Sequence, residues 1–277
     1  MFRLVFLSAL TTLIAGDCTL TCAAGDTCYA SPQLALDCLN SIPFNKEWAD
    51  ATIDVVSQSL ENFGFGALYH STGPPYSINL DIQDELADTL TMAEAGDFAT
   101  DLDFQEHVQS IFQKTIDAHT RYQKPACYNV VFVQPFAFDM RVENTSAVDD
   151  EPKTYLMRNL YTDQYVDEFN IEVDDFMDKE VLLLNGMEVT TEISEWGDTH
   201  ETRSNNRGIR FNAAIRSYLY RSAMATNILP VTDLTITLTS GESFTLPWMA
   251  SYTENFGNVS YCAAVPESTL PALSHRA

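Results

Sequence analysis

The sequence has few basic residues. Its 277 residues include 15 lysines and arginines against 39 aspartates and glutamates, which gives a formal net charge of −24. Between Glu47 and Gln113 there is no lysine or arginine, whereas the same interval holds 13 acidic residues. Nucleic acids and anionic membrane surfaces are bound through basic patches. The composition therefore speaks against both as main partners, and we expect the acidity to serve solubility rather than cation binding.

A long apolar run is also missing. The stretch from Leu4 to Ala15 is about a dozen residues long, whereas a membrane-spanning helix needs about 20. It follows Arg3 and ends at the small residues Ala15-Gly16, which is the pattern of a secretory signal peptide. We therefore predict that residues 1–16 are a signal peptide, that the mature chain is secreted, and that it has no membrane span.

Paired Cys-x-x-Cys spacings, which would indicate a zinc site, are absent as well. The six cysteines all follow the predicted signal peptide: Cys18, Cys22, Cys28, Cys38, Cys127 and Cys262. An even number of cysteines in an exported chain predicts disulfides. We favour two bridges within the Cys18 to Cys38 cluster and a long-range bridge between Cys127 and Cys262. No metal or other cofactor is expected.

Two short motifs predict N-glycosylation of a secreted protein. The acceptor sequence Asn-x-Ser/Thr is read only in the secretory pathway. One candidate is Asn144, in Asn144-Thr145-Ser146, and the other is Asn258, in Asn258-Val259-Ser260. Both asparagines are therefore candidate glycosylation sites.

The first half of the mature chain is predicted to be helical. Apolar residues recur three and four positions apart over residues 45–63, as on one face of a helix. Leu80 to Ala93 gives a weaker pattern of the same kind, and Gly96 ends it. A third helix is expected from Asp103 to Ile116, with Asp103 and Glu106 as a capping box. Residues 17–126 are thus interpreted as a Cys-rich lead-in followed by an acidic helical domain.

The second half is predicted to be rich in β-strands. Tyr128 to Phe138 is an apolar strand interrupted at Pro135, and the Asn-Gly turn within Val181 to Val189 indicates a hairpin. A helical face follows between Phe211 and Ser222, and Leu234 to Leu246 forms a second hairpin. The sequence therefore predicts an α+β fold, with a small β-rich domain at 127–250 and a polar tail at 251–277.

The corner between the two halves carries the main candidate for chemistry. Asp117-Ala118-His119-Thr120 lies where the third predicted helix meets the first strand. A neutral imidazole that is oriented by a carboxylate can accept a proton from a hydroxyl group near neutral pH. His119 is thus a candidate general base, and it can equally be a corner residue that hydrogen-bonds into the domain.

The order of these elements resembles a known family. Strand, Asn-Gly hairpin, helix and second hairpin resemble a PDZ-like module. Together with the acidic helices and the Asp-x-His-Thr corner, residues 40–250 resemble the N-terminal half of an S41-type serine peptidase, and more narrowly the secreted eukaryotic relatives of the chlamydial protease-like activity factor. The resemblance implies a serine endopeptidase. In the branch of the family with a Ser-His-Glu arrangement, His119 matches the histidine, whereas in branches with a Ser-Lys dyad this corner is structural.

The chain departs from the family in one respect. No Gly-x-Ser-x-Gly elbow is present, and Ser240, Ser243 and Ser251 lie in or beside a hairpin. The αβ peptidase core with its serine and glutamate is expected to be missing, so the triad is incomplete and the chain is expected to be truncated and inactive alone. The alternative is a secreted module that binds peptides or proteins without cleaving them. The sequence does not indicate an oligomeric state.

Two clusters of charge are further candidate sites. The acidic residues between Asp167 and Glu180 are a calcium candidate, but they lack the alternating ligand loop and are better read as a solvated face. The arginines between Arg203 and Arg221 can bind a substrate carboxylate or, as we favour, the protein's own carboxylates.

Overall fold

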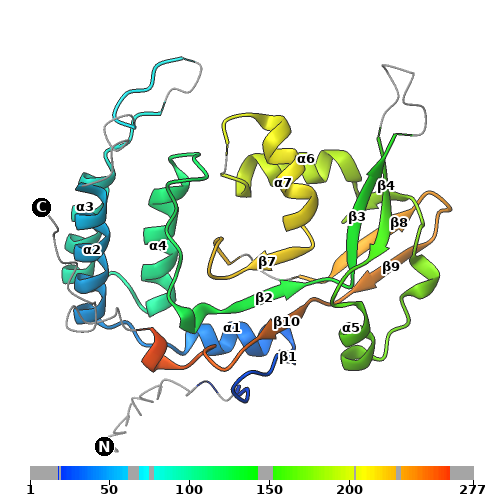
Figure 1. Ribbon diagram of the computed structural model, residues 1–277, viewed down its shortest axis with the longest axis horizontal. Coiled ribbons are helices and arrows are strands. Elements are labelled where there is room, and N and C mark those ends of the chain that lie inside the picture. Colours follow the sequence, from blue (N-terminus) through cyan, green and yellow to red (C-terminus); the bar gives the residue numbers. More distant parts are fainter. Residues whose placement is uncertain are drawn as a thin grey trace, which may run out of the picture.

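The fold is a mixture of α-helices and antiparallel β-sheets, as the sequence predicts. The computed structural model describes residues 18, 20–61, 69–74, 78–142, 152–202, 204–228 and 232–262. Within these ranges it has seven α-helices and three sheets. Figure 1 shows helices side by side at one end of the molecule, β-sheets at the other end, and a further sheet between them.

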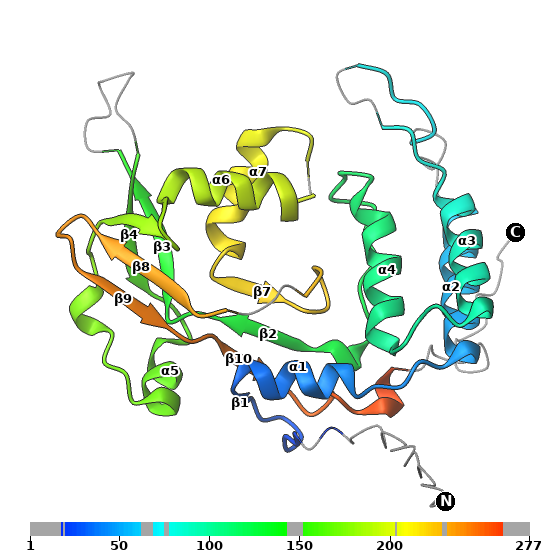
Figure 2. The ribbon, with the colours of Figure 1, turned by 180° about the vertical axis from the view of Figure 1, so that it is seen from behind.

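The first half of the chain supplies four helices. They are α1 (Pro32–Asn40), α2 (Lys46–Glu61), α3 (Ile82–Ala95) and α4 (Asp101–Gln113). Helix α3 packs against both α2 and α4. Their shared core includes Ile53, Leu86 and Phe104, none more than 2% exposed. Helix α1 lies in the Cys-rich lead-in, and it runs beside strand β10 (Met249–Tyr252) (Figure 2).

Local sequence signals set the ends of these helices. The Asp81 side chain caps the N-terminus of α3, and Gly96, with a φ of 80°, ends that helix in the left-handed conformation. Helix α4 begins with a capping box formed by Thr100 and Asp103. The prediction that Asp103 and Glu106 form this box was therefore wrong by one turn, because Asp103 is the third helical residue and the cap precedes it.

A four-stranded antiparallel sheet joins the two ends of the molecule. Its strand order is β1 (Cys28–Ala30), β10 (Met249–Tyr252), β2 (Val130–Val133) and β7 (Tyr220–Ser222). Strand β10 is central and buried at every position. The sequence pattern missed it and predicted a polar tail soon after Trp248. A strand buried on both faces has no polar-apolar alternation by which to recognise it.

Two further sheets build the β-rich end. Strand β3 (Phe136–Arg141) pairs with β4 (Lys153–Arg158). The single strand predicted over Tyr128–Phe138 is thus divided near Pro135 into β2 and β3, which belong to different sheets. The other sheet has the order β6 (Met187–Glu188), β5 (Val181–Leu184), β8 (Leu234–Leu238) and β9 (Ser243–Leu246). Both predicted hairpins are present in it. Asn185 and Gly186 have φ values of 50° and 86°, which is the left-handed conformation that a tight hairpin turn requires.

Three helices accompany these sheets, and their bounds correct the sequence analysis. They are α5 (Thr162–Phe169), α6 (Val189–His200) and α7 (Arg207–Ser217). Helix α6 was missed. The hairpin that turns at Asn185-Gly186 was expected to continue to Val189, but its second strand, β6, ends at Glu188, and the Glu188 side chain caps the helix. The helix expected to reach Ser222 ends at Ser217, and Tyr220 then begins β7. Short 3₁₀ helices lie at η2 (Ala126–Tyr128), η3 (Asp174–Phe176) and η4 (Val259–Tyr261).

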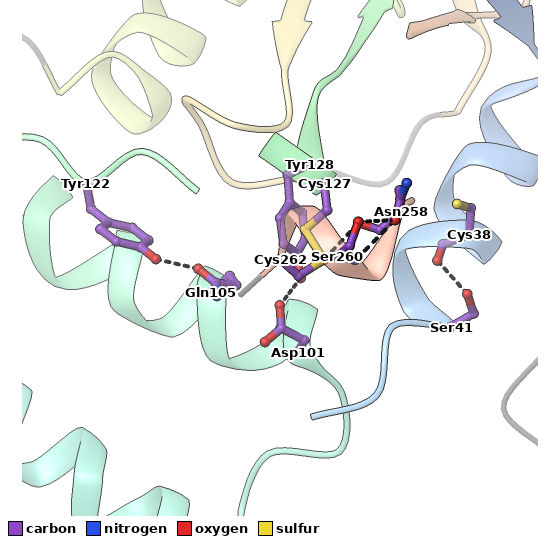
Figure 3. Close-up of a disulfide and its surroundings, with 10 residues drawn as sticks. All are labelled: Cys38, Ser41, Asp101, Gln105, Tyr122, Cys127, Tyr128, Asn258, Ser260 and Cys262. Atoms are coloured by element: carbon purple, nitrogen blue, oxygen red, sulfur yellow. Dashed lines mark hydrogen bonds between the residues drawn. A yellow bond between two sulfur atoms is a disulfide. The ribbon is translucent and has the colours of Figure 1, made fainter. Parts of the chain in front are cut away.

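The six cysteines form the three disulfides favoured from the sequence. The pairs are Cys18–Cys38, Cys22–Cys28 and Cys127–Cys262. Figure 3 shows the long-range bridge beside Tyr128, whose hydroxyl donates to Asp101 of α4 at 2.7 Å. The bridge thus ties the chain after β10 to the segment that leads into β2.

Some predictions concern residues outside the described ranges. These are the signal peptide at 1–16, the sequon at Asn144 and the end of the tail after Cys262. Among the helices that are described, none is both long and apolar enough to cross a membrane. The domain boundaries at 126 and 250 remain predictions.

Candidate functional site around His119

The predicted corner lies directly after α4. Lys114 ends the helix, and the chain then passes through Ile116, which has a φ of 51°. A left-handed conformation is unusual for a β-branched residue and costs about 1–3 kcal/mol. Strain of this kind persists where the surrounding structure holds it. The left-handed conformation of Ile116 turns the chain so that Asp117, His119 and Thr120 form a compact group.

Asp117 holds the His119 imidazole by its Nδ1 side. The Asp117 Oδ1 atom accepts a hydrogen bond from the His119 backbone N–H at 2.9 Å and lies 3.1 Å from His119 Nδ1. An ionised carboxylate can only accept, so Nδ1 is the nitrogen that carries the proton. The lone pair of the neutral ring is then on Nε2. Since the His119 side chain is 89% exposed, this lone pair is open to a reactant.

The second oxygen of Asp117 is fixed by two hydroxyl groups. Tyr69 donates to Asp117 Oδ2 at 2.6 Å, and Thr120 donates to it at 3.3 Å. Burial by itself would raise the pKa of Asp117, but the hydrogen bonds from His119, Tyr69 and Thr120 outweigh it and lower the pKa. Burial, and then the bond to Asp117, raise the pKa of Tyr69 to about 12. At neutral pH the carboxylate is therefore ionised and the phenol is a donor.

An apolar cavity of about 280 Å³ adjoins the histidine. Its lining residues come from α2, from the end of α4 and from the corner: Val56, Ser59, Leu60, Phe112, His119, Thr120, Arg121 and Tyr122. The Ser59 hydroxyl donates to the Val55 carbonyl within α2 at 2.7 Å. Ser59 therefore lines the same cavity as His119 but is already engaged in its own helix.

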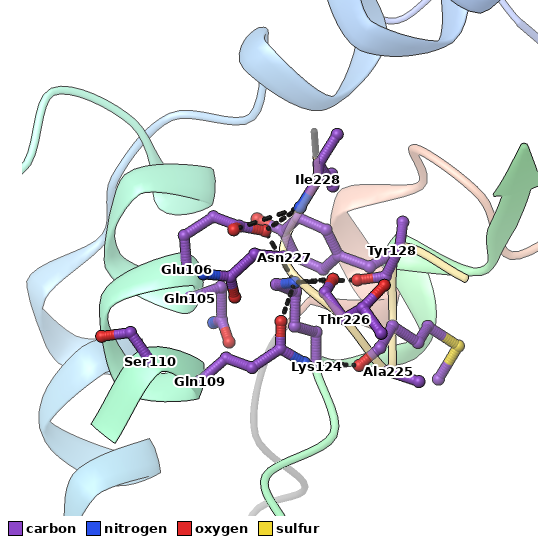
Figure 4. Close-up of polar contacts among 12 residues, drawn as sticks. Gln105, Glu106, Gln109, Ser110, Lys124, Tyr128, Ala225, Thr226, Asn227 and Ile228 are labelled. Carbon is purple, nitrogen blue, oxygen red and sulfur yellow. Dashed lines mark hydrogen bonds and ion pairs between the residues drawn. The ribbon is translucent and has the colours of Figure 1, made fainter. Parts of the chain in front are cut away.

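A buried lysine anchors the segment that follows the corner (Figure 4). The Lys124 side chain is fully buried, and its Nζ lies 2.7 Å from Glu106 Oε1 of α4. Lys124 Nζ also donates to Gln109 Oε1 at 2.6 Å. The backbone carbonyls of Ala223 and Thr226, beyond β7, accept from it at 2.8 and 3.0 Å. One ammonium group thus joins α4, the chain after His119 and the chain after β7.

Burial has opposite effects on the pKa values of this pair. It lowers the pKa of the Lys124 ammonium and raises that of the Glu106 carboxyl, and the attraction between the two charges opposes both shifts. The Glu106 carboxylate also accepts from the backbone N–H of Ile228 at 3.1 Å. With these partners the charged pair is fully hydrogen-bonded inside the protein.

The predicted arginine cluster divides into two separate arrangements. Arg207 and Arg210 of α7 both pair with Asp198 of α6, in agreement with the expectation that arginines bind the protein's own carboxylates. Arg221 does not belong to this helix, because it lies in β7. Its guanidinium lies 4.2 Å from the Trp196 ring centroid and 4.1 Å from that of Trp248. Arg203 lies outside the described residues.

The acidic run after α5 pairs with basic side chains. Arg158 contacts Asp174, and Arg141 lies 2.8 Å from Asp178. Over the described part of the chain, no group of three or more histidine, cysteine, aspartate or glutamate side chains could hold a metal ion. The candidate sequon at Asn258 is exposed at the start of η4, where Asn258 Oδ1 accepts from the Ser260 hydroxyl at 2.7 Å.

The three candidate serines lie in or beside β-strands, as the sequence indicates. Ser240 accepts a hydrogen bond within its own turn, Ser243 bonds across the hairpin to Thr237, and Ser251 is 5% exposed in β10. Sequence reasoning missed Tyr69, Glu106 and Lys124. The only signal for Lys124 was a lysine just ahead of a continuous apolar strand, which does not by itself indicate burial.

Comparison with known proteins gives a partial likeness of fold. No protein-family model matches the sequence, and no curated protein matches it significantly. The structure of mature CPAF complexed with lactacystin is similar at a TM-score of 0.48 and 11% identity, over 73% of this chain and 35% of that chain. Mature CPAF alone gives a TM-score of 0.47 and 12% identity, over 73% and 34%. The chain thus spans about a third of the length of these proteins.

Proposed function

We propose that this chain is the histidine-bearing, polypeptide-binding part of a secreted serine-type peptidase of the S41 kind. His119 is the general base and Asp117 orients it. The observation that carries the proposal is the placement of Asp117 Oδ1 at 3.1 Å from Nδ1, which leaves Nε2 open beside the apolar cavity. The serine nucleophile and the oxyanion donors come from residues other than those described.

The chemistry follows from the geometry. The Nε2 lone pair of His119 takes the proton of a hydroxyl group as that hydroxyl attacks a carbonyl carbon. The imidazolium that forms is stabilised by the ionised Asp117. Asp117 itself does not need to accept the proton, because its lowered pKa and its hydroxyl partners favour the charged form.

A second candidate function is a secreted module that binds polypeptides without cleaving them. The observation that favours it is the environment of Nε2: among the described residues, the hydrogen bonds of the His119 side chain are made to Asp117. In this alternative the Asp117–His119 pair is a stable corner, and the PDZ-like β-rich domain and the cavity provide binding alone.

Hydrolysis of an activated ester tests whether His119 Nε2 is free and reactive, and it needs no serine. In a p-nitrophenyl ester the leaving group departs easily, so an imidazole with a free Nε2 can attack the carbonyl carbon of an ester that is held in the adjoining apolar cavity. We expect the purified chain to release p-nitrophenolate. His119→Ala should lose most of this rate, and Asp117→Ala should lose part of it because the ring is no longer oriented.

His70 provides a matched control. Its Nδ1 lies 3.2 Å from Asp81 Oδ2 and its side chain is 51% exposed, but it does not line the cavity. His70→Ala should keep the full rate. Equal losses in the two histidine variants, or no loss in either, would contradict the proposal and favour the binding module. Labelling of the chain by a fluorophosphonate probe would show instead that a serine of this chain is the nucleophile.

A further inference from the structure

The cavity beside His119 has the features of a side-chain subsite. Four of its walls are apolar or aromatic: Val56, Leu60, Phe112 and Tyr122. We infer that this cavity receives an apolar side chain, leucine or a residue of similar size, of an extended basic polypeptide. The inference deepens the proposed function by naming the class of ligand that the same site takes.

The walls of the cavity are held before any ligand arrives. The rings of Phe112 and Tyr122 are stacked with their centroids 6.0 Å apart. The Tyr122 hydroxyl donates to Gln105 of α4, and Phe112 is only 6% exposed. Because these rings are fixed by packing and hydrogen bonds, a ligand side chain enters a cavity that is already formed. A preformed apolar cavity loses little entropy when it is filled.

The neighbouring cavities indicate a polypeptide rather than a small molecule. A narrow passage shares four lining residues with the apolar cavity: Phe112, Thr120, Arg121 and Tyr122. The passage in turn shares Gln113 and Thr202 with a larger polar cavity of about 490 Å³ between α4 and the α6–α7 connection. The polar cavity offers amide and hydroxyl groups from Ser110 and Asn205. The surface past His119 therefore presents an apolar subsite followed by hydrogen-bonding groups, which suits an extended backbone.

The negative charge of the protein favours basic residues on either side of the apolar residue that the cavity receives. The chain carries a formal charge of −24, and residues 47–113, which supply α3, α4 and all of α2 except its first residue, Lys46, contain no lysine or arginine. Lys114, at the end of α4, pairs with Glu85 at 2.8 Å, and Arg121, which lines the cavity, donates to the Ala225 carbonyl at 3.4 Å. A basic ligand is thus attracted by the acidic helices, and its association rate should fall as salt is added.

Binding of labelled peptides to the purified chain tests the inference. The probe is a fluorescent lysine- and serine-rich peptide with one leucine, compared with the same peptide carrying alanine or aspartate at that position. Fluorescence anisotropy should show that the leucine peptide binds at least about tenfold more tightly than the alanine peptide, because an apolar side chain is buried. Equal affinities, or tighter binding of an acidic peptide, would overturn the inference.

A cavity-filling variant locates the site. Ser59 is exposed on α2 and lines the cavity, so Ser59→Trp should fill it and remove the preference for leucine. Ala51→Trp, on the same helix but away from the cavity, should keep the preference. If leucine is still preferred in Ser59→Trp, the cavity is not the subsite. The peptide test is independent of ester hydrolysis. Leucine-selective binding without hydrolysis would support the subsite and would contradict only the proposed role of His119.

Discussion

Lys124 Nζ lies 2.7 Å from Glu106 Oε1, and the lysine side chain has no solvent exposure. Two charges buried in this way are tolerated only when their attraction and additional hydrogen bonds offset the loss of hydration. The additional bonds are present, because Gln109 and two backbone carbonyls accept from the same ammonium group. The pair therefore fixes the chain that follows His119 against α4.

Removing one member of this pair should be costly. Lys124→Met leaves the Glu106 carboxylate buried without its counter-charge, and we expect the free energy of unfolding to fall by about 3–5 kcal/mol. Urea denaturation followed by circular dichroism measures the change. The control is Lys46→Met, which breaks an exposed pair with Asp50 and should leave stability nearly unchanged. If the Lys124 variant is as stable as the control, the buried pair is not an anchor.

The contacts of Arg221 with two tryptophan rings should make the stability of the protein sensitive to replacement of this arginine by lysine. The guanidinium lies over the rings of Trp196 of α6 and of Trp248, next to β10, and burial lowers its pKa to about 10. A planar guanidinium stacks on two rings at once, and an ammonium does not. Arg221→Lys should therefore lower the free energy of unfolding by about 1–2 kcal/mol and alter the tryptophan fluorescence. The exposed Arg216→Lys should do neither.

The long-range disulfide should contribute more stability than the short one. Cys127 and Cys262 are 135 residues apart, whereas Cys22 and Cys28 are 6 apart. In the chain-entropy model, removal of the first bridge costs about 4–5 kcal/mol and removal of the second about 2 kcal/mol. Thermal denaturation of the two double-alanine variants measures the difference. A larger loss for the short loop would contradict the role assigned to the long-range bridge.

The stabilisation of the protein by the Asp117 carboxylate should be lost at low pH. Its folded-state pKa is lowered, so the stabilisation is fully present above the unfolded-state pKa of about 3.9 and is lost as the pH falls through the folded-state pKa. Asp117→Asn should be less stable than the unmodified chain by about 1–2 kcal/mol at neutral pH. The difference should shrink on acidification. A difference that is constant with pH would show that the carboxylate charge is not involved.

Much of the fold could be predicted from local sequence signals. The apolar spacing indicated α2 and α3, Gly96 marked the end of α3, and the Asn185-Gly186 turn marked the hairpin. These features depend on residues that are close in the sequence. Strand β10 was missed because it is buried on both faces and owes its structure to strands β1 and β2, which are distant in the sequence.

The candidate site was predictable only in part for the same reason. Asp117 and His119 are two positions apart, so their pairing is local and the corner was found. Tyr69 reaches Asp117 across 48 positions, and Lys124 reaches Glu106 only after the chain has turned around the corner. Neither partner belongs to a sequence motif. Long-range polar contacts of this kind become visible only in the folded chain.

The tautomer of His119 is the most direct test of the central claim, that Asp117 orients the ring so that Nε2 is free. Nitrogen NMR of the ¹⁵N-histidine-labelled chain, at a pH where the ring is neutral, distinguishes the protonated from the unprotonated nitrogen. The Asp117–Nδ1 contact predicts that His119 carries its proton on Nδ1, and that Asp117→Asn weakens this preference. A neutral ring with its proton on Nε2 would contradict the account, because that nitrogen could then no longer act as the base.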